Sequence, residues 1–348
     1  MEPIWAMGLM SGTSLDGVDA ALILTDGITV YDTAESIYIP YPSNFQDRLR
    51  SVLGKETASP SLIQESTQFH IQAIRELLYE TKHKVELIGY HGQTIYHAPP
   101  KTVQIGNAQT IFDEVNVPVV YDFRTQDCLN DGQGAPLVPI FHKALVQNLH
   151  EPTVVINIGG VANLTYIDDD TLIAGDIGPG NALINDVMVR DFAKPYDENG
   201  VLAAANPVNQ SALDLWLRDP YFDRIFPKSL DRDHFSSFKN VLSGGEAVAT
   251  LTELTIQSIL NSFSRLPKKP KYVYLCGGGA KNQTIASGLM PCITLKDSDM
   301  IEAQAFAYLA VRVLRGLPTS FPTTTGCTAP TCGGKITSPL EGGAGHSS

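Results

Sequence analysis

Apolar and polar residues alternate, or apolar residues run unbroken, in short stretches of the first forty residues. Ile4–Leu9 is an apolar run, while Val18–Leu24 and Ile28–Tyr31 alternate, and Asp26-Gly27 is typical of a hairpin turn. This pattern predicts an antiparallel β-meander. A similar succession returns at Thr153–Ile167: apolar strand, Gly turn, alternating strand. Two regions of the chain therefore begin with the same succession of elements, although the sequence has no short-period repeat.

Helical spacing of apolar residues marks several longer segments between the strands. Ser59 or Ser61 suits the first position of one helix, Asn181 that of another, and Ser243 with Glu246 forms a capping-box pattern for a third. The helices are expected at about 61–82, 182–192, 243–263 and 302–315. Strands alternating with helices of this length predict an α/β fold.

The chain is too long for one small core, so two lobes are expected. It has 348 residues, and the Gly-rich, aperiodic segment Asp131–Pro136 is typical of a hinge. The predicted lobes are residues 1–131 together with about 318–348, and residues 132–317.

The net charge and the cysteine spacing reduce the range of possible functions and compartments. The 25 basic and 37 acidic residues give a net charge of −12, and no basic stripe stands out, which argues against nucleic-acid or acidic-membrane binding. The spacing of the five cysteines matches neither a zinc site nor a redox pair and suggests a reducing compartment. With no signal-like start and no run of membrane-spanning length, the pattern predicts a cytoplasmic protein.

The turn between the first two strands combines glycine, hydroxyl and acid. Gly12 allows close backbone approach, so N–H groups here can face an anion. Ser11, Thr13 and Ser14 add hydroxyls, and Asp16 suits a hard cation such as Mg²⁺. The alternative reading is an ordinary Gly-rich hairpin turn.

Further Gly-rich turns follow later strands. Gly159-Gly160 repeats the opening pattern, so two such turns could clamp phosphates. Gly277–Gly279 lies between a buried strand and a helix. Without side chains, this turn would let the base or ribose of a nucleotide approach the backbone closely. The loop Gly178–Gly180 leads into a helix whose N-terminal amides are expected to face the cleft.

Polar residues follow three strands in the first lobe and suggest a hydrogen-bonding wall for a hydroxylated ligand. These residues are His91, Gln93 and Thr94, then Gln104 and Asn107, then Asp122 and Arg124. For any one of these residues, the alternative is a loop residue whose hydrogen bonds are made within the protein.

Several common enzyme motifs are missing from the sequence. There is no P-loop Gly-x-x-x-x-Gly-Lys-Ser/Thr, no Gly-x-Gly-x-x-Gly after the first strand, no Gly-x-Ser-x-Gly, and no His-rich metal cluster. The remaining pattern suits a nucleotide held between lobes beside a hydroxylated acceptor, with Mg²⁺ bridging phosphates.

At this point a family resemblance becomes specific, because Met10–Asp19 resembles the signature of the anhydro-N-acetylmuramic acid kinases. These enzymes belong to the actin/hexokinase/Hsp70-like superfamily, together with the levoglucosan kinases. Similar blocks follow in order at 91–94, 104–107, 122–124, 132–136, 157–160, 178–181, 227–229 and 276–279.

The resemblance implies a two-lobed actin-like (ribonuclease H-like) ATPase fold, with mixed sheets flanked by helices and an interlobe cleft. It implies that ATP is bound by Gly12, Thr13, Ser14, Leu15, Asp16, Gly17, Val18, Asp19, Asn157, Gly159, Gly160, Gly277, Gly278 and Gly279. The polar wall would line the anhydrosugar, and Asp16 and Glu302 would lie near Mg²⁺. Family enzymes hydrolyse the 1,6-anhydro ring of anhydro-N-acetylmuramic acid and phosphorylate O6 in cell-wall recycling, and the family suggests a homodimer.

One position departs from the family pattern. The general base of the family is an Asp four residues after the Asn of Gly-Pro-Gly-Asn, and Asn185 stands there in this chain. A neutral amide cannot accept a proton at physiological pH. Asp186 is adjacent, but one residue along a helix turns about 100° away. The sequence therefore predicts either a kinase impaired in catalysis or a protein that binds ATP and anhydrosugar without turnover.

Overall fold

The structure is a computed structural model that describes residues 1–12, 14–230 and 234–337. Contacts divide the chain into two compact units. Among the described residues, unit 1 holds those in 1–134, 302–321 and 327–337, and unit 2 holds those in 135–301 and 322–326. The predicted lobe boundaries instead place residues 302–317 with the second lobe and residues 322–326 with the first, so the two divisions differ at the last long helix and at this short segment.

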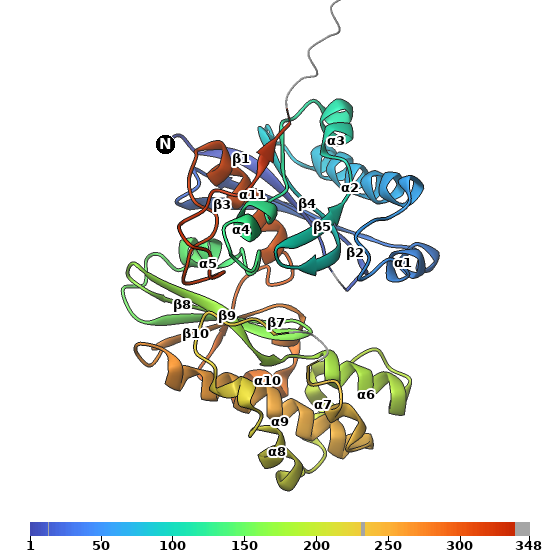
Figure 1. The fold of residues 1–348 in the computed structure, drawn as a ribbon, viewed down its shortest axis with the longest axis vertical. Helices are drawn as coiled ribbons and strands as arrows, with labels where there is room; N and C mark the ends of the chain where they lie inside the picture. The colour runs from blue at the N-terminus through green and yellow to red at the C-terminus, as the bar shows by residue number, and fades with distance from the viewer. Residues whose placement is uncertain (13, 231–233, 338–348) are drawn as a thin grey trace, which may run out of the picture. The chain divides into compact units, whose positions relative to one another are not determined.

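Unit 1 is built on a mixed sheet. Its strands are β1 (Ile4–Ser11), β2 (Gly17–Thr25), β3 (Val30–Pro40), β4 (Leu87–Ala98), β5 (Lys101–Ile105), β6 (Val119–Tyr121) and β12 (Lys335–Ile336). Its helices are α1 (Ser43–Arg50), α2 (Pro60–Glu80), α3 (Ala108–Val115), α4 (Thr125–Leu129) and α11 (Ile301–Leu314). The sheet order is β12-β6-β4-β1-β2-β3, with β5 paired to β4. β1, β2 and β3 pair antiparallel, whereas β1, β4 and β6 run parallel (Figure 1).

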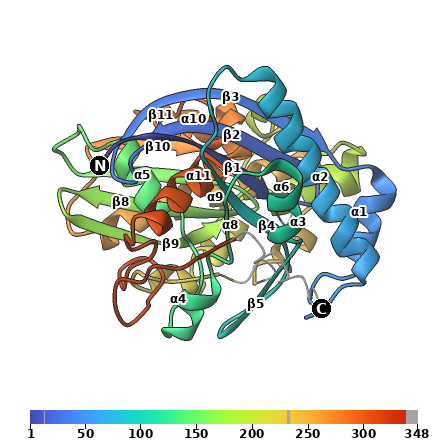
Figure 2. The ribbon, with the colours of Figure 1, turned by 90° about the horizontal axis from the view of Figure 1, so that it is seen from above.

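Helices cover both faces of this sheet. α2 lies against β2 and β3 (Figure 2). Its buried residues join a core with alternate residues of β1, including Met7 and Leu9. The opposite face of β1 presents Gly8, which pairs in register with Gly89 of β4. A Cβ on Gly8 would lie 1.8 Å from the Ala303 carbonyl oxygen. The backbone of α11 therefore lies directly on this sheet, which explains why this helix belongs to unit 1.

Unit 2 has a second mixed sheet with the order β11-β10-β7-β8-β9. Its strands are β7 (Thr153–Ile158), β8 (Val161–Asp168), β9 (Thr171–Pro179), β10 (Tyr272–Cys276) and β11 (Ile293–Thr294). Its α-helices are α5 (Pro139–Leu145), α6 (Ala182–Phe192), α7 (Val201–Ala204), α8 (Gln210–Trp216), α9 (Gly244–Ser262) and α10 (Gln283–Gly288). Short 3-10 turns are η1 (Glu198–Gly200), η2 (Pro220–Asp223), η3 (Phe238–Asn240), η4 (Phe263–Arg265) and η5 (Gly278–Lys281). The long helix α9 contacts β9 and packs against α6, α7, α8 and α10 (Figure 1).

Two predicted helix caps differ from the structure. Ser243 does precede α9, but its side chain makes no capping hydrogen bond. Glu246 does not complete a capping box, because its carboxylate accepts a hydrogen bond from the Asn209 side chain at 3.1 Å. Asn181 likewise precedes α6 without a side-chain cap, since its backbone is already helical. In contrast, Ser59 caps α2 by accepting from the backbone N–H of Leu62 at 3.3 Å.

The two sheets share one topology. In each, three antiparallel strands in sequence order are followed by two strands parallel to the first, giving the spatial order 3-2-1-4-5. This is the strand order of the ribonuclease H-like fold. It confirms the expected fold class of mixed sheets flanked by helices, and it explains why Thr153–Ile167 repeats the pattern of the first strands.

Candidate functional site

The predicted phosphate turn of unit 1 connects β1 to β2. The Gly12 carbonyl accepts hydrogen bonds from the Leu15 backbone N–H at 3.2 Å and from the Gln93 side chain at 2.9 Å. The Asp16 carbonyl accepts from the Tyr41 backbone N–H at 2.7 Å. Two carbonyls of the turn are thus bonded to the body of unit 1. Thr13, which the sequence also places here, lies outside the described residues.

Side chains of this turn divide between the interior and the surface. Ser11 is buried, and its hydroxyl bonds the ring of His70 at 3.0 Å. Ser14 is exposed and donates to the Asp16 carboxylate. Leu15 has a left-handed backbone (φ 60°) and a buried side chain. Only Ser14 and Asp16 therefore offer side-chain oxygens at the surface of the described turn.

Glu302 lies at the first turn of α11, within the electrostatic field of two other site residues. Burial raises the pKa of its carboxyl, the Arg124 guanidinium opposes that shift, and the charge of Asp16 adds to it. Within the described ranges, no group of three or more His, Cys, Asp or Glu side chains is arranged to hold a metal. A cation here would rely on one or two carboxylates and on ligand oxygens, which is how Mg²⁺ is commonly bound.

A hollow of about 370 Å³ opens beside β4, β5, β6 and the start of α3. This volume is within the range of small-molecule pockets. Four residues of the predicted polar wall line it: His91, Gln104, Asn107 and Asp122. Further lining residues with polar side chains, which the sequence pattern missed, are Tyr90, Thr102, Gln109, Tyr121 and Thr125. Thr102 stands two residues before Gln104 on a strand, so period-two alternation could have indicated it.

The polar block 91–94 does not end its strand, as the sequence suggests, but lies in the middle of β4. Gly92 has a left-handed backbone (φ 77°), after which β4 continues to Ala98 and pairs antiparallel with β5. The bend interrupts the regular alternation of side chains. His91 therefore lines the hollow, whereas Gln93 and Thr94 do not.

His91 and Arg124 form a directed pair. His91 Nδ1 lies 2.7 Å from the Gly92 carbonyl, which only accepts, so this nitrogen carries the proton. His91 Nε2 is then free to accept from Arg124 Nε at 2.9 Å. Burial and the neighbouring Arg124 charge hold the pKa of His91 well below its ordinary value. Neutral His91 thus orients Arg124, which also donates to the Gly134 carbonyl at 2.6 Å.

The other wall residues are partly bonded within the protein. Gln104 donates to the Thr102 hydroxyl at 2.7 Å, and Asn107 caps α3 by accepting from the Thr110 N–H at 3.0 Å. Asp122 pairs with Lys335 at 2.7 Å. Amides and carboxylates have several bonding positions, so these contacts orient the groups and leave capacity for a ligand.

The Gly-rich turns of unit 2 gather at one edge of its sheet. β7, β9 and β10 run parallel, and their carboxyl ends lead into Gly159, Gly180 and Gly277 respectively. The Gly159 carbonyl accepts from the Asn181 N–H at 2.8 Å, and a Cβ on Gly277 would lie 2.2 Å from the Asn157 side-chain oxygen. Backbone groups of all three turns therefore meet at this edge.

The two residues at the family's general-base position differ in surroundings. Asn185 is half-buried in the first turns of α6. Asp186 is exposed, and its carboxylate forms an ion pair with Lys239 at 2.5 Å. Its carboxylate is therefore engaged on the outer side of the helix.

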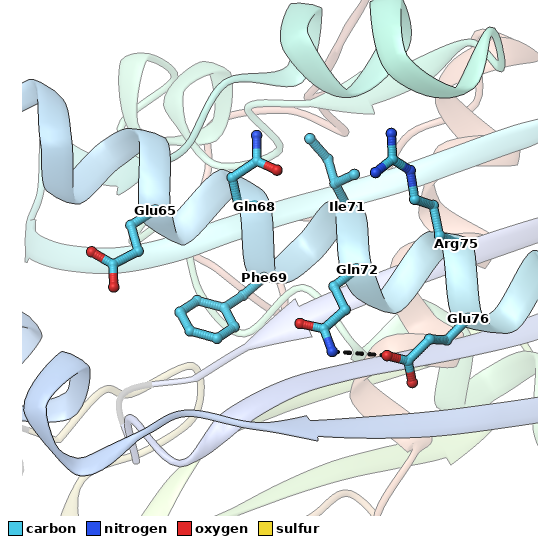
Figure 3. A pocket seen from close by; sticks show the side chains of 7 residues that line it. All are labelled: Glu65, Gln68, Phe69, Ile71, Gln72, Arg75 and Glu76. Carbon is cyan, nitrogen blue, oxygen red and sulfur yellow. Dashed lines mark hydrogen bonds between the residues drawn. The ribbon is translucent and has the colours of Figure 1, made fainter.

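A second hollow, of about 330 Å³, runs along α2 and holds none of the predicted site residues (Figure 3). Its lining residues all come from that helix. Gln72 donates to Glu76 at 2.8 Å across one helical turn, and Arg75 pairs with Glu114 of α3 at 2.5 Å. These are the contacts of a solvated helix face.

Comparison with known proteins decides the family. A family model described as "Anhydro-N-acetylmuramic acid kinase" matches residues 5–339. This chain belongs to the anhydro-N-acetylmuramic acid kinase family. The expected class of ATP-dependent carbohydrate kinase is thereby confirmed.

Individual relatives match along nearly their whole length. A protein of Bradyrhizobium diazoefficiens named anhydro-N-acetylmuramic acid kinase is 42% identical, covering 96% of this chain and 99% of its own. One of Roseobacter denitrificans with the same name is 40% identical, covering 97% and 95%. Among solved structures, component A of (R)-2-hydroxyglutaryl-CoA dehydratase from Acidaminococcus fermentans aligns with a TM-score of 0.49 at 12% identity, covering 89% of this chain and 98% of that one. Across the described part of this kinase, no helix has the length and apolar character that crossing a bilayer needs.

Proposed function

We propose that this kinase uses ATP to convert 1,6-anhydro-N-acetylmuramic acid into N-acetylmuramic acid 6-phosphate. The observation that carries the proposal is the family match across residues 5–339. The hollow beside β4 and β5 supports it, because its amide, carboxylate, imidazole and hydroxyl groups suit a ligand rich in hydroxyls. In this proposal His91, Gln104, Asn107 and Asp122 bind the sugar, and Arg124 is held beside them.

ATP would be bound by the turns of both units. The described part of Gly12–Asp19 would face phosphates in unit 1, as would Asn157 with Gly159 and Gly160 in unit 2. Gly277, Gly278 and Gly279 would take the adenosine. The donor set fits Mg²⁺, since Asp16 and Glu302 supply carboxylates within one electrostatic neighbourhood. When bound, Mg²⁺ would neutralise phosphate charge.

The reaction needs a group that takes a proton from water. Water attacks C1, the bond between C1 and O6 breaks, and O6 attacks the γ-phosphorus of ATP while the bond to ADP breaks. One proton of the water must leave to a base. Asn185 stands at the family's base position and cannot accept that proton. Loss of a general base typically slows a reaction by roughly 10²–10⁴-fold.

Asp186 is a poor substitute in this proposal. Its carboxylate pairs with Lys239, and it stands one helical position from Asn185. We therefore propose a slow kinase as the first candidate. The second candidate is a protein that binds ATP and anhydrosugar without turnover, and the same two residues favour it.

An ADP-release assay with 1,6-anhydro-N-acetylmuramic acid separates the candidates. We expect Asn185→Asp to raise turnover by roughly 10²–10⁴-fold, because it restores an ionised carboxylate. Asp186→Ala should change turnover by less than about threefold, since its partner is Lys239 rather than the substrate. Turnover of the unmodified chain that vanishes in Asp186→Ala would instead identify Asp186 as the base. Turnover of the unmodified chain with no gain from Asn185→Asp would contradict the argument from the base position.

A further inference from the structure

Two buried side chains hold the turn after β1 from inside unit 1. Gln93 of β4 is 0% exposed and donates from Nε2 to the Gly12 carbonyl at 2.9 Å. His70 of α2 is also 0% exposed, and its Nε2 lies 3.0 Å from the Ser11 hydroxyl. Neither contact involves the hollow beside β4 and β5. Both meet the chain where β1 ends and the turn begins.

The chemistry of the neighbouring atoms fixes the direction of these hydrogen bonds. His70 Nδ1 lies 2.7 Å from the Ser66 carbonyl, so Nδ1 carries the proton and Nε2 accepts from Ser11. The amide nitrogen of Gln93 faces two carbonyls, those of Gly12 and Thr94, and only its N–H groups can bond them. Burial lowers the pKa of His70 to about 4, so its ring stays neutral near pH 7.

Such bonds determine which backbone groups a turn presents to solvent. A carbonyl directed at a phosphate would repel it, whereas an N–H would bind it. The Gly12 carbonyl is occupied by Gln93 and by the Leu15 N–H, and the Asp16 carbonyl by the Tyr41 N–H. These two carbonyl oxygens are therefore engaged within unit 1 and are not available to repel a phosphate.

We propose that Gln93 and His70 are positioning residues for the nucleotide. They hold the Gly12 carbonyl and the Ser11 hydroxyl inward, which preorganises the described residues at the start of the turn for the phosphates of ATP. This assigns Gln93 to the nucleotide rather than to the sugar, although the sequence pattern groups it with the polar wall. The proposal rests on the proposed function, because it takes ATP as the ligand of this turn.

The decisive variant is Gln93→Met, which keeps the length of the side chain and removes its donor. It is made in the full chain carrying Asn185→Asp, so that turnover can be measured. We expect the Kd and KM for Mg·ATP to rise about fivefold to twentyfold, which corresponds to one lost buried hydrogen bond. The KM for the anhydrosugar should stay within about twofold. His70→Phe should act in the same direction, and His70→Gln, which keeps an acceptor, should recover most of the affinity.

His142→Phe is the matched control. His142 is a buried histidine of α5 in unit 2, bonded to the Thr165 hydroxyl at 2.8 Å, and burial lowers its pKa to about 3. Its loss should lower thermal stability without changing the ratio of the two KM values. If Gln93→Met lowered ATP and sugar affinity equally, Gln93 would have a purely structural role. If it raised only the sugar KM, Gln93 would be a sugar ligand. Either result overturns the inference.

The starting proteins separate this inference from the proposed function. If neither the unmodified chain nor Asn185→Asp bound Mg·ATP in calorimetry, the proposed function would fail, and the inference with it. If both bound it and Gln93→Met bound it equally well, only the role of Gln93 and His70 would be refuted.

Discussion

The two units share one strand order, yet they hold their first turns by different means. In unit 1, buried side chains from other elements supplement the backbone bonds of the turn: Gln93 donates to the Gly12 carbonyl, and His70 accepts from the Ser11 hydroxyl. In unit 2, backbone groups hold it. The Gly159 carbonyl accepts from the Asn181 N–H at 2.8 Å, and the Gly160 carbonyl accepts from the Gly180 N–H at 2.9 Å.

This difference separates the kinds of change that each turn tolerates. A side-chain bond is lost by one substitution that leaves the backbone in place. A backbone bond survives most substitutions, but it requires two chain segments to approach closely, and only glycine permits that at some positions. The turn of unit 1 should therefore be sensitive to substitution of the polar side chains that bond it. The turn of unit 2 should be sensitive to Cβ atoms added to its glycines.

Gly180→Ala should give the largest effect on stability. The added Cβ would lie 2.1 Å from the Gly159 carbonyl oxygen, so one backbone segment must move. We expect a loss of about 3 kcal/mol, at the upper end for overpacking, measured as a lower urea midpoint. Gly160→Ala is the matched control, because its nearest contact would be an ordinary 3.4 Å to the Ala182 Cβ. Equal losses in both variants would contradict the idea of a backbone-held turn.

Local patterns predicted much of the fold. Apolar runs identified the strands β1 and β7, alternation identified β2 and β8, and helical spacing identified α2, α6, α9 and α11, because all three patterns are properties of short segments. The side of α11 could not be predicted in this way. It depends on the pairing of Gly8 with Gly89, a long-range register that brings two strand glycines under one helix. Glycines inside apolar strands were the available signal.

The candidate site was predictable in part, because polar residues of neighbouring parallel strands were expected to lie close together. His91 and Asp122 lie at neighbouring parallel strands and line one hollow. Gln93 was grouped with His91 because residues two apart on a regular strand share a face. The left-handed backbone of Gly92 breaks that relation and turns Gln93 toward β1. No pattern in the sequence indicates this bend, and the role of His70 depends on where α2 packs.

One buried acid, Asp26, and one half-buried acid, Asp176, extend the comparison of the two units to pH. In unit 1, burial disfavours the charge of Asp26, but N–H donors of Thr29 and Ile28 outweigh it and lower the pKa of Asp26 below 3.8. In unit 2, burial dominates and raises the pKa of Asp176 to about 6, although the Leu230 N–H bonds its carboxylate. The unfolded chain releases the Asp176 proton near pH 3.8. Asp176 therefore costs stability as pH rises through the window from about 4 to 6.

Asp176→Asn should remove that cost while keeping an acceptor for the Leu230 N–H. We expect it to stabilise the protein by roughly 1–3 kcal/mol at pH 8 and to have little effect at pH 4. Asp26→Asn should do the opposite, because it removes a charge that the fold favours. Its penalty should be present at pH 7 and fade as pH falls below the unfolded pKa. Urea midpoints at several pH values measure the stability change of both variants. A gain from Asp176→Asn that was larger at pH 4 than at pH 8 would contradict a raised pKa of Asp176 in the folded protein.

The smallest expected effect concerns the N-cap residues of the two long helices α2 and α9. Ser59 accepts a hydrogen bond from the Leu62 N–H at the start of α2, whereas Ser243 makes no such bond at the start of α9. Ser59→Ala should therefore cost about 1 kcal/mol, the usual value of an N-cap, and Ser243→Ala should cost only a few tenths. Both residues precede helices that cover their sheets, so helix propensity alone would give the two variants similar losses. A difference in thermal midpoint in the stated direction would show that a shared topology does not imply shared local stabilisation.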